Sequence, residues 1–221
     1  MKRDAAQSKA RIRTAAAALF AAQGFDGATV DAIAANAGVN KAMVYYHFDD
    51  KLALYRDLLS EMFDAIGGGL RQVRAAGGRP DDQLRAYVGV LQRAGLERPY
   101  FPALWLREIA ENGRHLDVPQ LQGIRQVLVE LGALLAEGQA QLGWRRVDPF
   151  LIQLGIVGPL MLFLASAGVR ERFRAAQAEP PTASTPDDAA AHVTTMTLAA
   201  LNAAPPLPAT PTKRPARRTS R

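Results

Sequence analysis

Apolar residues recur at helical spacing along most of the chain. Between residues 5 and 23, one side of a helix collects Ile12, Ala16, Leu19 and Phe20. Gly24 is expected to end this helix, and the glycines at 67–69 are expected to end the predicted helix over residues 51–66. Further helices are predicted over residues 29–36, 41–48, 51–66, 81–96, 102–112, 119–142, 148–173 and 186–203. Strand alternation is not sustained, so the sequence predicts an all-α fold.

The first two short helices, 29–36 and 41–48, are expected to form a helix-turn-helix. Thr29 is a good N-cap, because its hydroxyl can accept a hydrogen bond from a free amide of the first turn. Gly38 tolerates the left-handed backbone that stops a helix abruptly, and Asn40 can cap the next helix. Val39 is expected to fill the corner between the two helices.

The second short helix has an apolar side and a polar side. Val44 and Phe48 lie one turn apart and should face the core. The exposed side should pair Lys41 with Tyr45, Ala42 with Tyr46, and Met43 with His47. These side chains can reach phosphates and base edges, so the helix is suited to a DNA major groove. The alternative is that the tyrosines are half-buried aromatics, His47 a solvated helix end and Met43 a packing residue.

Lys51 lies in the first turn of the following helix, after the capping residue Asp50. Its charge and the free amides of that turn can hold a phosphate together.

Residues Ile12 to about Leu58 resemble the DNA-binding domain of the tetracycline-repressor (TetR) family of transcriptional regulators. The resemblance is carried by "AAALFAAQGFDGATVDAIAANAGVNKAMVYYHFDDKLAL". It implies that Thr29, Tyr45 and Lys51 bind phosphates. The complete set that we expect at the DNA is Thr29, Asn40, Lys41, Ala42, Met43, Tyr45, Tyr46, His47 and Lys51.

Two departures from the family pattern bear on specificity. Ala42 and Met43 stand where glycine or a small hydroxyl residue is common, and "YYHF" replaces the frequent "YHYF". Met43 offers apolar contact, for instance to a thymine methyl group, without the hydrogen bond of a threonine. The operator is therefore not expected to match that of a relative.

The resemblance also implies a C-terminal helical domain that binds an effector and forms a homodimer. We divide the chain into a DNA-binding domain (1–50), an effector-binding and dimerisation domain (51–203) and a disordered basic, proline-rich tail (204–221). The expected pocket residues, for which core packing is the alternative role, are Tyr100, Phe101, Trp105, Arg107 and Met161. The expected dimer-interface residues are Leu160, Phe163, Leu164, His192, Met196, Ala199 and Ala200.

The segment 150–169 carries no charge and is long enough to cross a bilayer. Gln153, the internal pair Gly158 and Pro159, and the lack of a second span argue against this. An all-round apolar helix is also typical of one buried between a domain core and a partner subunit, which is the interpretation we prefer.

Composition narrows the function further. The net charge is +6. The chain contains no cysteine, which excludes disulfides and cysteine catalysis and fits a reduced, cytoplasmic setting. The N-terminus shows no export signal. Basic residues gather at the two ends, as Lys2, Arg3, Lys9, Arg11 and Arg13, and as Lys213, Arg214, Arg217, Arg218 and Arg221. The histidines, His47, His115 and His192, are scattered, so we expect no enzyme, metal or cofactor.

The sequence thus predicts a homodimeric regulator, a repressor that a small organic effector releases from a palindromic operator in double-stranded DNA. A ligand-independent architectural DNA-binding protein, favoured by the basic tail, is one alternative. A membrane-associated protein that inserts residues 150–169 is the other.

Overall fold

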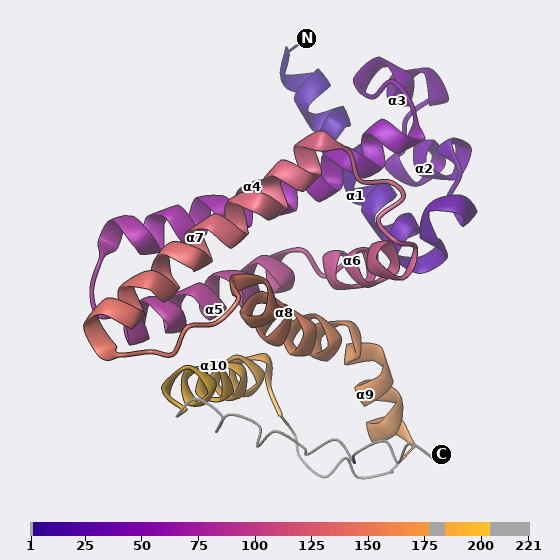
Figure 1. Cartoon of the computed structure of the whole chain (residues 1–221). Helices are drawn as coiled ribbons and strands as arrows, with labels where there is room; N and C mark the ends of the chain where they lie inside the picture. Colours follow the sequence, from indigo (N-terminus) through magenta and orange to yellow (C-terminus); the bar gives the residue numbers. More distant parts are fainter. Residues whose placement is uncertain (1, 177–183, 204–221) are drawn as a thin grey trace, which may run out of the picture.

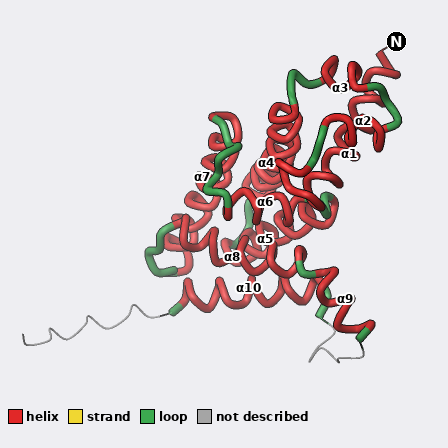
Figure 2. Tube along the Cα trace, turned by 90° about the vertical axis from the view of Figure 1, so that its right-hand side faces the viewer, coloured by secondary structure: helices red, strands yellow, loops and turns green. Residues whose placement is uncertain are grey.

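The computed structural model describes residues 2–176 and 184–203, which form helices and their connections without strands (Figure 1, Figure 2). The helices are α1 (Lys2–Gly27), α2 (Val30–Ala37), α3 (Lys41–His47), α4 (Lys51–Ala76), α5 (Pro80–Glu97), α6 (Phe101–Ala110), α7 (Val118–Leu142), α8 (Pro149–Ala165), α9 (Ala167–Ala175) and α10 (Pro186–Asn202). The predicted all-α fold is confirmed. The predicted tail, 204–221, lies outside the described residues.

The helices form a small N-terminal group and a larger C-terminal group (Figure 1). Helices α1, α2 and α3 pack together at one end, and α6 contacts α1. Helix α4 begins beside this group and then runs along α7 and α5. Helices α8 and α10 pack against each other and against α5 on the side away from α4. Because α4 contacts both groups, it connects the N-terminal helices mechanically to the C-terminal domain.

The predicted stop at Gly24 corresponds to a break in α1, where this residue is non-helical with φ 75° and ψ 177°. The glycines at 67–69, in contrast, do not end α4, so that prediction is wrong. The helix continues through them to Ala76. The reason is tertiary: a Cβ atom at Gly69 would lie 2.7 Å from Cγ1 of Val90 on α5. The missing side chain allows α5 to approach, and packing offsets the low helix propensity of glycine.

The helix predicted over 148–173 is two helices, α8 and α9, which is a second correction. They meet at Ser166 with a bend of 44°. Ser166 Oγ donates to the Phe163 carbonyl at 2.9 Å, and Arg170 Nη1 donates to Ser166 Oγ at 2.7 Å. These side-chain bonds stabilise the end of α8.

Among the described residues, no single helix has the length and apolar character of a membrane span, although α8 and α9 taken together meet that test.

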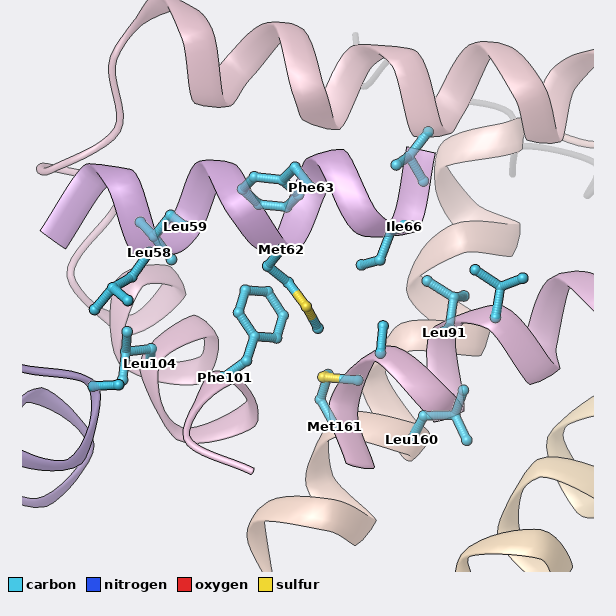
Figure 3. Close-up of a cluster of buried hydrophobic side chains, with 14 of the residues drawn as sticks. Leu58, Leu59, Met62, Phe63, Ile66, Leu91, Phe101, Leu104, Leu160 and Met161 are labelled. Atoms are coloured by element: carbon cyan, nitrogen blue, oxygen red, sulfur yellow. The ribbon is translucent and has the colours of Figure 1, made fainter. Parts of the chain in front are cut away.

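The core of the C-terminal domain is a layer of aliphatic and aromatic side chains between α4, α5, α6 and α8 (Figure 3). Met62 and Ile66 of α4 point towards Phe101 of α6 and Met161 of α8. Met62 is fully buried and Met161 nearly so. This layer joins the helix that leads away from α3 to helices of the C-terminal domain.

Candidate DNA-binding helix and ligand cavity

The turn between α2 and α3 has the capping geometry that the sequence predicts. Thr29 Oγ1 accepts from the amide of Ala32 at 3.1 Å, and Asn40 Oδ1 accepts from the amide of Met43 at 2.8 Å. Gly38 has φ 63° and ψ 38°, a conformation that glycine adopts without strain. The two caps and the left-handed turn fix the angle at which α3 leaves α2.

Helix α3 buries one side and exposes the other. Val44 is 1% exposed and Phe48 6% exposed, whereas Tyr46 is 74% exposed and Tyr45 47% exposed. Met43 is partly buried against the core. It therefore has a packing role whether or not it also contacts a base. The polar side of α3 is a free surface, as the sequence predicts for a DNA-reading helix.

Lys41 does not point freely into solvent. Its Nζ donates to Asp31 Oδ2 at 2.9 Å, and this hydrogen bond raises the pKa of Lys41. The pair ties the first turn of α3 to α2, on the surface that would face DNA. A contact of Lys41 with a phosphate or a base would require Lys41 to release this carboxylate.

His47 is held by Ser8, a residue that carries no signal of its own in the sequence. Ser8 of α1 is 6% exposed, and its Oγ lies 2.7 Å from His47 Nε2. The single hydroxyl proton of Ser8 goes to the Ala5 carbonyl, at 2.9 Å. Ser8 must therefore accept, so His47 carries its proton on Nε2. Nothing in the sequence pattern pairs residues 8 and 47, because they meet only when α1 packs on α3.

Lys51 braces the N-terminal helices. Its Nζ donates to the carbonyls of Phe25 and Ala28 at 2.9 and 3.0 Å and lies 4.3 Å from the centre of the Phe25 ring. An ammonium group has three protons, so one remains for a phosphate. Lys51 thus has a structural role beside the DNA contact that the resemblance implies.

Three basic residues of α1, Lys9, Arg11 and Arg13, have different surroundings. Arg13 forms ion pairs with Asp57, at 3.0 Å, and with Glu61, both on α4. Lys9 lies 5.2 Å from the centre of the Phe48 ring and 3.9 Å from Asp57, whereas Arg11 is exposed. Arg13 therefore serves α1–α4 packing, Lys9 lies between Asp57 of α4 and Phe48 at the end of α3, and Arg11 lies beside Gly38 in the turn between α2 and α3.

An apolar cavity of about 140 Å³ lies between α4, α6, α7 and α8. It is lined by Phe63, Ile66, Leu91, Phe101, Trp105, Leu106, Ile109, Ile124, Val127, Leu128, Phe150, Gln153, Leu154, Val157, Gly158 and Met161. Three expected pocket residues, Phe101, Trp105 and Met161, are among them. The α7 and α8 side chains carry no sequence signal that distinguishes a cavity wall from an ordinary core.

The two other expected pocket residues lie elsewhere. Tyr100 lines an open polar groove with Arg13, Glu61 and Arg98, between α1, α4 and the end of α5. Arg107 faces α1, where its Nη2 donates to the Ala22 carbonyl at 3.5 Å. Both follow from the helical period of α6, which turns these positions away from the side that carries Trp105.

A buried polar cluster joins α6, the loop that follows it and α4. Glu108 of α6 is 1% exposed and accepts from the His115 amide at 2.9 Å, from His115 Nδ1 at 2.8 Å and from the Tyr55 hydroxyl at 3.1 Å. Burial, and next the charge of Glu108, raise the pKa of Tyr55. Tyr55 lies on α4, so this cluster connects α6 to the helix that follows α3.

The exposed sides of α8 and α10 carry apolar residues. Leu151, Leu154 and Leu162 of α8 and Met196 of α10 are all about half exposed or more. Of the expected interface residues, His192, Met196, Ala199 and Ala200 lie on the exposed side of α10. Leu160 is buried in the core of the chain itself, and Phe163 and Leu164 are partly buried.

These features define a helix-turn-helix domain: a capped turn presents a short helix whose free side carries basic and aromatic side chains. Residues 12–58 match the family model of bacterial regulatory proteins of the tetR family. This N-terminal region, about a fifth of the chain, is therefore similar to the DNA-binding domain of TetR-family regulators.

Similar proteins include two curated regulators. The HTH-type negative transcriptional regulator IcaR of the biofilm operon icaADBC, from Staphylococcus aureus (strain Newman), is 41% identical over 58 residues, which are 26% of this chain and 31% of IcaR. The HTH-type transcriptional activator FasR of Mycolicibacterium smegmatis is 34% identical over 82 residues, 37% of each protein. The matches therefore span 31% of the length of IcaR and 37% of that of FasR.

The fold extends the likeness over nearly the whole chain. The crystal structure of a tetR-family regulatory protein from Rhodococcus RHA1 superposes with a TM-score of 0.69 at 19% identity, covering 90% of this chain and 98% of that one. The C-terminal domain thus has the helical architecture of a TetR-family regulator.

Proposed function

We propose that this chain is a homodimeric, sequence-specific transcriptional repressor that leaves a palindromic operator when a small organic effector binds its C-terminal domain. The observation that carries the proposal is the free side of α3, where Tyr45, Tyr46 and Lys41 are exposed beside a rigidly capped turn. A helix presented in this way enters a major groove, and a symmetric dimer places two such helices in successive grooves. Such a regulator acts in the cytoplasm, on the chromosome.

The exposed apolar sides of α8 and α10 support dimerisation. A monomer rarely leaves a contiguous apolar surface in water, and small residues such as Ala199 and Ala200 allow helices to approach closely. Substitution Met196→Glu places a charge on this surface, where Met196 is 55% exposed and contributes little to the subunit core. We expect a monomer by light scattering with unchanged helicity, and a variant that stays dimeric would contradict this interface.

The position of the cavity supports regulation by an effector. Phe63 and Ile66 belong to α4 and Trp105 and Ile109 to α6, so the cavity wall includes both helices that contact the N-terminal group. The Glu108 cluster ties the same two helices together. An effector that binds one arrangement of these helices more tightly than another shifts the spacing of the two α3 helices in the dimer.

Selection of bound sequences from a random duplex library, with the full-length protein at physiological salt, tests DNA reading. We expect a palindrome. Lys41→Ala should change the preferred bases, whereas Tyr45→Phe should weaken binding to all sequences alike, by about 0.5–1.5 kcal/mol for one phosphate contact. Binding without any sequence preference, together with a steep salt dependence, would favour the architectural alternative.

An experiment in cells tests whether the chain represses or activates transcription. One relative is a negative regulator and another an activator, so the resemblance accommodates both. With the selected palindrome placed over a promoter, we expect expression of the chain to lower reporter output. Higher output would identify an activator.

A further inference from the structure

The cavity between α4, α6, α7 and α8 restricts the charge of its ligand. None of its lining side chains is charged, and Gln153 is the one amide among them. A carboxylate or an ammonium group entering this space would lose its hydration without gaining an opposite charge. The wall therefore favours uncharged molecules.

Gln153 presents a donor to this cavity. The hydroxyl of Tyr87, on α5, donates to Gln153 Oε1 at 2.5 Å. Tyr87 is 2% exposed, and burial raises the pKa of its hydroxyl, so Tyr87 keeps its proton at neutral pH. This contact fixes the amide with Oε1 towards Tyr87. Gln153 Nε2 makes no hydrogen bond to the described residues, although both of its protons can donate.

Size and wall chemistry limit the ligand further. A cavity of about 140 Å³ is close to the roughly 150 Å³ of an engineered protein cavity that binds benzene. Phe63 meets Trp105 edge-on with ring centroids 5.4 Å apart, and Phe101 stacks with Trp105 at 6.2 Å. Aromatic walls in these orientations leave edges and faces for another ring.

We propose that the cavity takes an uncharged molecule of about the size of a substituted benzene, which presents a carbonyl oxygen to Gln153 Nε2. This inference rests on the proposed function, because it names the chemical class of the effector at that site. One neutral hydrogen bond is expected to favour the carbonyl compound over its hydrocarbon counterpart about 3- to 10-fold. The uncompensated charge of a carboxylate should weaken binding by about 100-fold or more.

Ligand-detected NMR titrations of the full-length protein at pH 7.5, without DNA, test this with three probes of similar size: acetophenone, ethylbenzene and benzoate. We expect acetophenone to bind most tightly, ethylbenzene about 3- to 10-fold more weakly, and benzoate not measurably. Benzoate binding as tight as that of acetophenone, or no binding of any probe, would overturn the proposal.

The matched variant is Gln153→Leu combined with Tyr87→Phe, which removes the amide without leaving a buried hydroxyl unpaired. It should bind ethylbenzene as the wild type does and lose the preference for acetophenone. A preference that persists in this variant would exclude Gln153 as the recognising group. The titrations contain no DNA, so a negative titration result argues only against the proposed ligand class. A negative result in the DNA selection argues only against operator recognition and does not affect the titrations.

Discussion

Two neighbouring glycines of α4, Gly68 and Gly69, allow a matched test of the close packing between α4 and α5, which explains why α4 does not end at residues 67–69. Replacing either glycine by alanine should gain up to about 1 kcal/mol of helix propensity. At Gly68 the new Cβ meets only the far end of Arg71, at 3.9 Å. At Gly69 it would lie 2.7, 3.2 and 3.5 Å from three atoms of Val90, a β-branched side chain that is stiff at χ1.

Overpacking of this kind costs about 1–3 kcal/mol. Gly68→Ala should therefore stabilise the protein by up to ~1 kcal/mol, and Gly69→Ala should be less stable than Gly68→Ala by ~1–3 kcal/mol. For a chain of this length the melting temperatures should differ by about 2–12 °C. Thermal unfolding followed by circular dichroism, at one protein concentration, measures the difference.

Val90→Ala in the Gly69→Ala background provides the control, since removal of the γ-methyl groups makes room for the new Cβ. The double variant should lose less stability than the sum of the two single variants. Equal melting temperatures for Gly68→Ala and Gly69→Ala would refute the close approach of α4 and α5 as the reason why a glycine occupies position 69.

The remaining predictions concern polar contacts. Glu108→Ala leaves buried donors without an acceptor and should lower the free energy of unfolding, measured in urea, by about 3–5 kcal/mol. Substitution of the more exposed Glu111 by alanine should lower it by less than about 1 kcal/mol. Similar losses in the two variants would show that the buried hydrogen bonds of Glu108 do not stabilise the fold. Ser8→Ala removes the acceptor of His47 Nε2 and should weaken operator binding about 2- to 12-fold in a gel-shift titration. The melting temperature should change little. Unchanged operator affinity would show that DNA binding does not depend on the hydrogen bond between Ser8 and His47. Burial raises the pKa of Tyr87, so above pH 10 the unfolded chain loses a proton that the folded chain keeps, and stability should fall with rising pH by up to ~1.4 kcal/mol per pH unit. Tyr87→Phe should remove that part of the slope, and an unchanged slope in urea unfolding between pH 9 and pH 11 would contradict it.

Local chemistry makes the helix-turn-helix predictable from sequence. Thr29, Gly38 and Asn40 act through contacts within a few residues, and the one-turn spacing of Val44 and Phe48 decides which side of α3 is buried. Such short-range determinants operate in any tertiary context. The capped turn and the free side of α3 therefore follow from the order of the residues alone.

Two features that sequence reasoning missed, the continuation of α4 through its glycines and the role of Gln153, depend on contacts between distant segments. The glycines of α4 are compatible with a helix only because α5 comes close to position 69, and the sequence around them contains no sign of Val90. The cavity also depends on residues that are distant in the sequence. Of the five residues predicted for the pocket, Phe101, Trp105 and Met161 line the cavity, but Gln153 becomes a candidate only through Tyr87, which orients its amide.

For this protein, the sequence by itself determined the helical class, the reading helix and its exposed side, because periodicity and capping are set by neighbouring residues. Only the tertiary structure decided which polar groups already have partners: Lys41 pairs with Asp31, Lys51 with two carbonyls, and His47 with Ser8. A hydrogen bond requires two groups within about 3 Å, and helical periodicity carries no information about which surfaces of distant helices meet.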